Sequence, residues 1–276
     1  ATLDDLNKSE AIVIWSEDLK ENLPVLYLRV RQAVKNGVKL IVFGHSNSTL
    51  EDIADFYYSG DIVSENFEIV KDISKLKGIK EYVKDKEVTA IIGKSTPYQL
   101  DKNLDKLVSY LVENSNTKIM NAFSSGNTFG AITNLDNVKN LSDFAKDINS
   151  ENTNLLFVVG SDPIGRSVFS NEIHKIIEDI DNVVCLDLFL HETSELGNYI
   201  IPTSSTLGEK EGTFTNIEFR TSRIDKLVPS PGQTLSDWEF ISGLSNFCNF
   251  KNNIDSLDGL NKLAYQQFDN EDSPLF

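Results

Sequence analysis

Residues 11–43 are AIVIWSEDLKENLPVLYLRVRQAVKNGVKLIVF, and this stretch decides the fold class. Its two ends, 11–15 and 38–43, are short, apolar and rich in β-branched side chains, which predicts two buried strands. Between them, Pro24 suits the first turn of a helix and Gly37 suits a left-handed residue after its last turn. The stretch therefore predicts one strand–helix–strand unit of the usual length, about 30 residues.

The helix after Pro24 is predicted to turn an apolar stripe towards the sheet, beside three basic side chains. The stripe consists of Val25, Leu28, Val30 and Val34, and the basic residues are Arg29, Arg31 and Lys35.

The alternation of apolar strands and amphipathic helices continues along the chain. Further strands are predicted at 88–92, 117–121, 155–159, 183–188 and 199–202. Ile53, Tyr57 and Tyr58 instead favour a short helix. This pattern predicts an α/β protein with doubly wound, mainly parallel sheets in three α/β/α layers.

A loop-rich stretch at 124–140 suggests that the chain forms two Rossmann-like lobes. We place the first lobe at residues 1–118, the second at 119–250 and a C-terminal tail at 251–276. Both ends are polar or lack a helix or strand pattern, so we expect an internal piece of a longer chain.

Charge excludes several classes of partner. Acidic residues outnumber basic ones by 42 to 26, for a formal net charge of −16. Nucleic acid and anionic lipid carry the same sign, so neither is an expected partner. No apolar stretch reaches the roughly 20 residues that span a bilayer, so direct membrane insertion is not expected.

Cysteine usage indicates a reducing compartment. The two cysteines, Cys185 and Cys248, are far apart, and no Cys-x-x-Cys occurs. Cys185 lies in an apolar run and is predicted to be a buried free thiol. Two such thiols fit the cytoplasm better than a secreted scaffold.

Two glycine motifs invite a phosphate-binding interpretation, and both fail it. Gly93-Lys94-Ser95 follows a predicted strand, but a phosphate loop needs a glycine where Val88 stands. In Gly160–Gly165, Asp162 takes the place of the middle glycine, so its side chain would block and repel a pyrophosphate. We therefore predict that NADH does not bind in this chain.

The histidines give no metal-ligand spacing, and no Gly-x-Ser-x-Gly elbow supports a hydrolase. His191 follows a predicted strand, and we interpret it as a solvated loop histidine. Thr193 is predicted to cap a short helix. No catalytic residue and no metal ligand are predicted.

Residues 183–223 carry a family resemblance. The segment from Asp187 to Pro202 resembles D-x-F-x-T-E-T-A-x-x-A-D-x-V-L-P of the molybdopterin oxidoreductase superfamily. The segment from Glu209 to Arg220 resembles its E-x-x-G-T-F-x-N-x-E-G-R, with Phe219 in place of the glycine. Weaker likenesses follow the family order at 24–40, 125–131, 160–163 and 231–238. The resemblance implies lobes of the type found in domains 1–3 of formate dehydrogenase and DMSO reductase.

One departure separates the branches of this superfamily. Molybdenum enzymes usually follow the second strand with Asp-Pro-Arg, whereas this chain continues Phe43-Gly44-His45-Ser46. The large iron–sulfur subunit of respiratory complex I, the NADH:quinone oxidoreductase, also lacks the triplet and favours a glycine there. The chain is thus most similar to an internal fragment of that iron–sulfur subunit.

That resemblance implies a scaffold. The parent would support electron transfer from NADH through FMN and iron–sulfur clusters to quinone, coupled to proton translocation. Its [4Fe-4S] and [2Fe-2S] clusters would lie elsewhere in the parent, because two distant cysteines cannot hold one. The implied partners are other peripheral-arm subunits, at the cytoplasmic side of the inner (plasma) membrane.

Two alternatives remain. The first is a fragment of a molybdenum or tungsten bis-pterin oxidoreductase, such as a formate dehydrogenase or nitrate reductase. In that case Ser161, Asp162, Asp187 and Thr193 are candidate contacts to a pterin guanosine, which would otherwise be a vestigial site. The second is a free nucleotide-binding α/β protein, which the failed phosphate motifs disfavour.

Overall fold

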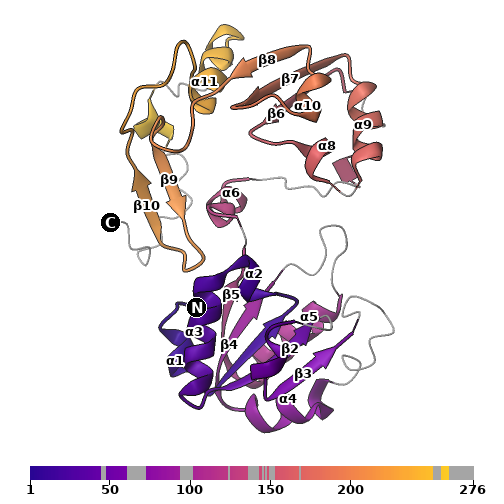
Figure 1. Cartoon of the computed structure of the whole chain (residues 1–276), viewed down its shortest axis with the longest axis vertical. Coiled ribbons are helices and arrows are strands. Elements are labelled where there is room, and N and C mark those ends of the chain that lie inside the picture. Colours follow the sequence, from indigo (N-terminus) through magenta and orange to yellow (C-terminus); the bar gives the residue numbers. More distant parts are fainter. Residues whose placement is uncertain are drawn as a thin grey trace. The chain divides into compact units, whose positions relative to one another are not determined.

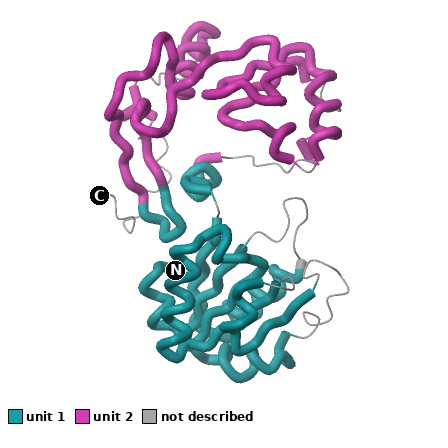
Figure 2. The backbone as a smooth tube through the Cα atoms, viewed as in Figure 1, with its two compact units in different colours: residues 1–133, 215–220 teal, residues 134–214, 221–276 magenta. Residues whose placement is uncertain are grey.

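The chain divides into two compact units (Figure 2). Unit 1 comprises residues 1–133 and 215–220, and unit 2 comprises 134–214 and 221–276. The structure, a computed structural model, describes residues 1–44, 48–60, 73–93, 102–123, 125–135, 143–144, 146, 148, 153–167, 169–250 and 256–260. The boundary expected after residue 118 falls inside a strand of unit 1, and the chain divides after Thr133 instead.

Unit 1 contains a five-stranded parallel sheet (Figure 1). Its strands are β1 (Ala11–Trp15), β2 (Lys39–Gly44), β3 (Phe56–Ser59), β4 (Glu87–Ile92) and β5 (Asn116–Asn121). They are arranged in the order β3-β2-β1-β4-β5, and Trp15 lies opposite both Phe43 and Ile92. The chain reverses its direction across the sheet between β1 and β4, which makes their carboxyl ends the expected ligand position.

Helices cover both faces of this sheet, as expected for three layers. One face carries α1 (Asp5–Lys8), α2 (Leu19–Asn22) and α3 (Pro24–Lys35), and the other carries α4 (Lys77–Tyr82) and α5 (Lys102–Asn114). Because strand side chains alternate, Ile12 and Ile14 enter the first core while Val13 and Trp15 enter the second.

The apolar stripe predicted for α3 is partly wrong. Leu26, Val30 and Ala33 are buried, whereas Val25 and Leu28 are 64% and 58% exposed. The apolar residues of α3 are numerous enough that either of two helix faces could be turned towards the sheet. Packing against the sheet selects the face that contains Leu26.

The short helix predicted around Tyr57 is also wrong. Residues Phe56–Ser59 form β3, which pairs in parallel with β2. Aromatic side chains favour strands, and Tyr58 stacks on Phe43 of β2 with ring centroids 5.0 Å apart.

Unit 2 contains a three-stranded parallel sheet in the order β6-β7-β8. The strands are β6 (Leu155–Val159), β7 (Asn182–Asp187) and β8 (Tyr199–Pro202), and the helices are α8 (Pro163–Arg166), α9 (Ser170–Glu178) and α10 (Glu192–Glu195). Residues of α8 and α9 pack on one face of the sheet with Cys185, which is buried as predicted. On the other face Leu155, Phe157 and Val159 are exposed.

After β8 come β9 (Gly212–Thr215) and β10 (Thr221–Ile224), which form a two-stranded sheet, and then α11 (Asp237–Phe247). The tip between β9 and β10 belongs to unit 1. There Asn127 Oδ1 accepts a hydrogen bond from the Thr215 N–H at 2.8 Å. Nearby, α6 (Thr128–Thr133) places Phe129 edge-on to Phe219, with centroids 4.1 Å apart.

Phe219 stands where the family segment has a glycine, and its backbone lies in a region that glycine adopts readily. Its φ is 63°, in the left-handed region that favours glycine. Asn216 Oδ1 accepts hydrogen bonds from the Glu218 and Arg220 N–H groups, which holds this turn in place. This chain therefore forms a left-handed turn with a phenylalanine at this position.

Within the described part of the chain, no helix has the length and apolar character needed to cross a bilayer.

Candidate functional site

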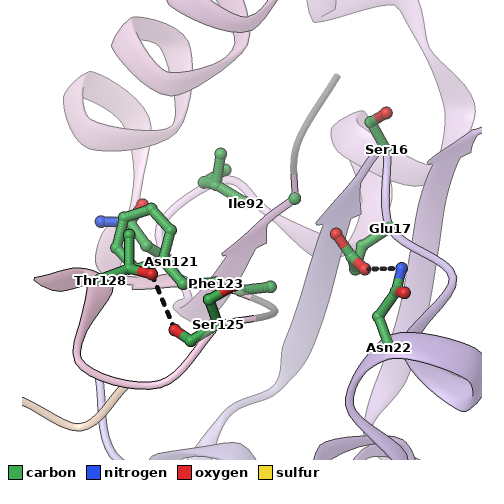
Figure 3. A pocket seen from close by; sticks show the side chains of 10 residues that line it. Ser16, Glu17, Asn22, Ile92, Asn121, Phe123, Ser125 and Thr128 are labelled. Atoms are coloured by element: carbon green, nitrogen blue, oxygen red, sulfur yellow. Dashed lines mark hydrogen bonds between the residues drawn. The ribbon is translucent and has the colours of Figure 1, made fainter. Parts of the chain in front are cut away.

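A pocket of about 660 Å³ lies at the carboxyl ends of β1, β4 and β5 in unit 1 (Figure 3). Its place is the one that parallel α/β sheets use for ligands, where the strand order reverses. Its size suits a small molecule. The lining residues are Ser16, Glu17, Asn22, Ile92, Gly93, Asn121, Ala122, Phe123, Ser125 and Thr128.

Glu17 is the buried acid of this pocket, with 8% of the residue exposed. Asn22, the last residue of α2, donates its side-chain N–H to Glu17 Oε1 at 2.7 Å. Ser16 has a φ of 54°, so the chain turns sharply as soon as β1 ends. This strained turn directs the Glu17 carboxylate across the strand ends.

Gly93 makes room for Glu17. A Cβ at Gly93 would lie 2.5 Å from Glu17 Cβ and 2.7 Å from the Ser16 carbonyl oxygen. The glycine of the Gly93-Lys94-Ser95 motif is therefore needed for packing against β1, in agreement with the rejection of a phosphate loop. Lys94 and Ser95 lie outside the described residues.

The opposite side of the pocket is built from the end of β5 and the loop that follows it. Asn121, Ser125 and Thr128 supply polar groups, and the Thr128 hydroxyl donates to the Ser125 carbonyl at 2.8 Å. Phe123 and Ile92 supply apolar wall. This pocket was not singled out from the sequence, although the ends of three predicted strands would have located it.

A second polar cluster lies at the carboxyl ends of β6 and β7 in unit 2, with His191 at its centre. His191 Nδ1 lies 3.3 Å from Asp162 Oδ1, and His191 Nε2 lies 3.3 Å from Asp187 Oδ2. The three side chains are 14–20% exposed. Asp162 precedes α8 and Asp187 ends β7, so the parallel strands bring together residues 25 positions apart.

Asp162 is held by several donors. It accepts hydrogen bonds from the Thr193 hydroxyl at 2.6 Å, the Thr193 N–H at 3.2 Å and the Gly165 N–H at 3.1 Å. Burial acts to raise the pKa of Asp162, but these hydrogen bonds and the nearby His191 outweigh it, so the pKa is lowered. Asp162 is therefore a carboxylate at neutral pH.

The structure thus brings together three of the four residues proposed from the sequence. Asp162 and Thr193 are in direct contact, and His191 joins them to Asp187. Ser161 is exposed beside Asp162.

The interpretation of His191 as a solvated loop residue is wrong. Its side chain is 14% exposed and forms the N-cap of α10. Thr193 was predicted to be that cap, but its hydroxyl bonds Asp162 instead. The spacing of four residues between Asp187 and His191 was the available signal, and the approach of Asp162 depends on tertiary structure.

The cluster is not arranged around a metal. The two carboxylates contact opposite nitrogens of one imidazole ring and so do not converge on a point. Across the described ranges, no three His, Cys, Asp or Glu side chains form a group suited to a metal ion.

The profile of the molybdopterin oxidoreductase family matches residues 1–247. The chain belongs to this molybdopterin oxidoreductase family. Among similar proteins, the F420-dependent formate dehydrogenase 2 subunit alpha of Methanococcus maripaludis is 38% identical over 95 residues, 34% of this chain. The assimilatory nitrate reductase catalytic subunit of Bacillus subtilis is 35% identical over 99 residues, 36% of this chain. The matched segments span 14% of the length of each of these relatives.

Acetylene hydratase from Pelobacter acetylenicus has a similar structure, with a TM-score of 0.52 at 16% sequence identity. The likeness covers 89% of this chain and 48% of the hydratase, and it shows the fold alone. Family membership and this fold together confirm the α/β architecture expected from residues 11–43.

Proposed function

We propose that the chain is part of a molybdopterin-dependent oxidoreductase of the formate dehydrogenase or nitrate reductase type. The family match over residues 1–247, with relatives that carry those names, is the observation that supports this best. It favours the bis-pterin alternative over the iron–sulfur subunit of complex I.

The residues at the strand ends of unit 2 fit the nucleoside part of such a cofactor. A guanine base and a ribose present N–H and O–H donors, and carboxylates are strong acceptors for both. Asp162 Oδ2 takes no hydrogen bond from a residue in the described ranges, so it is available to a ligand. Gly160 has a φ of 57° and open space where a Cβ would stand, so a ligand can approach its backbone.

When bound, the pterin cofactor would supply the metal centre at which electrons are exchanged with substrate. The residues of this chain would have a different task. Asp162 and Asp187 would accept hydrogen bonds from the nucleoside end, and Thr193 would keep Asp162 oriented through its 2.6 Å hydrogen bond.

The test uses the full-length parent enzyme carrying Asp162→Asn or Asp187→Asn. Molybdenum, tungsten and guanine nucleotide released on denaturation are measured against protein, and thermal unfolding checks that each variant folds. We expect folded variants with a several-fold lower content of metal and nucleotide. Asp181→Asn is the matched control, because Asp181 is exposed on the same unit. Normal content in both site variants would reject the assignment.

The second candidate is the scaffold of the complex I iron–sulfur subunit. The specific observation in its favour is Phe43-Gly44-His45-Ser46, which replaces the Asp-Pro-Arg that molybdenum enzymes have after this strand. A Cβ at Gly44 would lie 3.0 Å from the Tyr57 hydroxyl. The absence of a side chain at Gly44 therefore leaves room for the Tyr57 ring of β3. Peripheral-arm subunits and a site at the cytoplasmic face of the membrane would then be its partners and location.

The metal analysis also separates these candidates. A parent with stoichiometric molybdenum or tungsten and formate- or nitrate-dependent electron transfer supports the first. A parent with iron alone, and with NADH:quinone activity in its native assembly, supports the second.

A further inference from the structure

Each nitrogen of the His191 ring lies beside a carboxylate. A neutral ring has one N–H donor and one acceptor nitrogen. Carboxylate oxygens lie 3.3 Å from both nitrogens, and a carboxylate cannot donate. Either neutral form therefore points one nitrogen lone pair at a carboxylate.

The backbone around the ring biases the choice between the neutral forms. The Ser194 N–H lies 3.3 Å from His191 Nδ1 and so favours Nδ1 as the acceptor and Nε2–H as the donor to Asp187. In that form Nδ1 faces Asp162 Oδ1 without a proton between them. The Ser194 N–H also has the His191 carbonyl at 2.9 Å, so it keeps a partner if Nδ1 becomes a donor.

We propose that His191 is a positioning residue that makes the ligand site at the strand ends of unit 2 proton-dependent. When the ring is protonated, it donates to Asp162 and Asp187 together and neutralises the acceptors that a ligand would use. When the ring is neutral, it donates to Asp187 alone, and the charge of Asp162 is left uncompensated for a ligand at Oδ2. The ligand class is a nucleoside that presents N–H and O–H donors, and this class rests on the proposed function.

The family segment has threonine at the position of His191. A threonine hydroxyl has a single proton and no charged form near neutral pH, so it could not couple the two carboxylates in this way. The proton-dependence is thus expected of a histidine at this position and not of a threonine.

Two carboxylates face the His191 ring from other elements of the fold. Asp162 faces it from the loop before α8, and Asp187 faces it from the end of β7. Burial, assisted by the charge of Asp187, raises the pKa of Cys185, whose thiol contacts the Thr193 carbonyl and stays neutral. Glu192 and Glu195 lie on α10 itself.

The first test needs no ligand. The whole chain is labelled with nitrogen-15, and the ring nitrogens of His191 and the amide of Ser194 are followed between about pH 5 and 8, where histidine ordinarily changes charge. We expect Nδ1 to change from acceptor to donor as the pH falls, with a matching shift of the Ser194 amide. Asp162→Asn should weaken this coupling. His174 on α9, which is 46% exposed and 3.7 Å from Glu178, is the internal control.

The second test uses guanosine as the probe and measures its affinity at both ends of this pH range. We expect binding to be about five- to tenfold weaker at the acidic end, at the lower end of typical couplings between sites. His191→Gln keeps one donor and one acceptor but cannot be protonated, so its affinity should be independent of pH.

A failure of the proposed function and a failure of the role of His191 give different results in these two tests. If guanosine does not bind at either pH, the proposed function loses its site, while the Ser194 response still decides the role of His191. If the Ser194 amide ignores the His191 ring, or if His191→Gln leaves the pH dependence of guanosine binding intact, the inference is overturned.

Discussion

Glu17 occupies the space that a side chain at Gly93 would need. The missing Cβ would lie 2.5 Å from Glu17 Cβ, at the point where β1 and β4 end side by side. We expect Gly93→Ala to lower the free energy of unfolding by about 1–3 kcal/mol, the usual cost of overpacking. Chemical denaturation of the chain measures it. Gly212→Ala is the control, because a Cβ there meets no atom within 4 Å.

Phe219 combines a strained backbone with a favourable ring contact, and two variants separate them. Phe219→Ala removes the ring that packs on Phe129 and keeps the left-handed φ of 63°. Phe219→Gly removes the ring and the strain. We therefore expect the glycine variant to be more stable than the alanine variant by about 1 kcal/mol. Equal unfolding midpoints would show that the turn is not held in this conformation.

Asn127 secures the tip of the β9–β10 segment to α6 and its loop. Its Oδ1 accepts from the Thr215 N–H at 2.8 Å, and its own φ of 59° suits asparagine, aspartate and glycine better than most other residues. We expect Asn127→Ala to destabilise the chain by about 1–3 kcal/mol, because it removes this hydrogen bond and places alanine in the left-handed region. Asn127→Asp keeps the acceptor and should recover most of the loss in thermal unfolding.

Asp5 gives the stability of unit 1 an acid dependence. Its hydrogen bond from Lys118 lowers the pKa of Asp5 to about 2, against the opposing effect of burial and with help from Thr2. A carboxyl with a depressed folded-state pKa stabilises the fold above its unfolded pKa of about 4, and this contribution is lost as the pH falls towards 2. Asp5→Asn should lower the unfolding temperature at pH 7 and flatten its decline between pH 4 and 2. Asp4→Asn, at an exposed neighbour, should do neither.

Most strands of the two larger sheets could be predicted because short apolar runs between polar turns have few other solutions. Residues 11–15, 155–159 and 199–202 form strands with the predicted bounds. The phase of α3 and the identity of β3 could not be predicted, since both depend on neighbours distant in sequence. Leu26 is chosen over Leu28 by the sheet, and Phe56–Ser59 becomes a strand by pairing with β2.

Part of the candidate site in unit 2 could be predicted from the sequence. Asp162 and Asp187 were named because the family resemblance implied a pterin site at these strand ends, and Asp162 also begins a helix with Pro163. Glu17 and His191 were missed because their importance comes from contacts. Glu17 fits beside the strand end because Gly93 has no side chain, and His191 lies between two carboxylates because the ends of β6 and β7 are adjacent.

The division of unit 1 between residues 1–133 and 215–220 has a consequence for biosynthesis. A ribosome must translate the intervening 81 residues, 134–214, before the partners of Asn127 and Phe129 emerge. At about 5–20 residues per second this interval lasts several seconds, during which the nascent sheet lacks its final contacts. Chaperone engagement should therefore peak in that interval, and slower translation of residues 134–214 should prolong it.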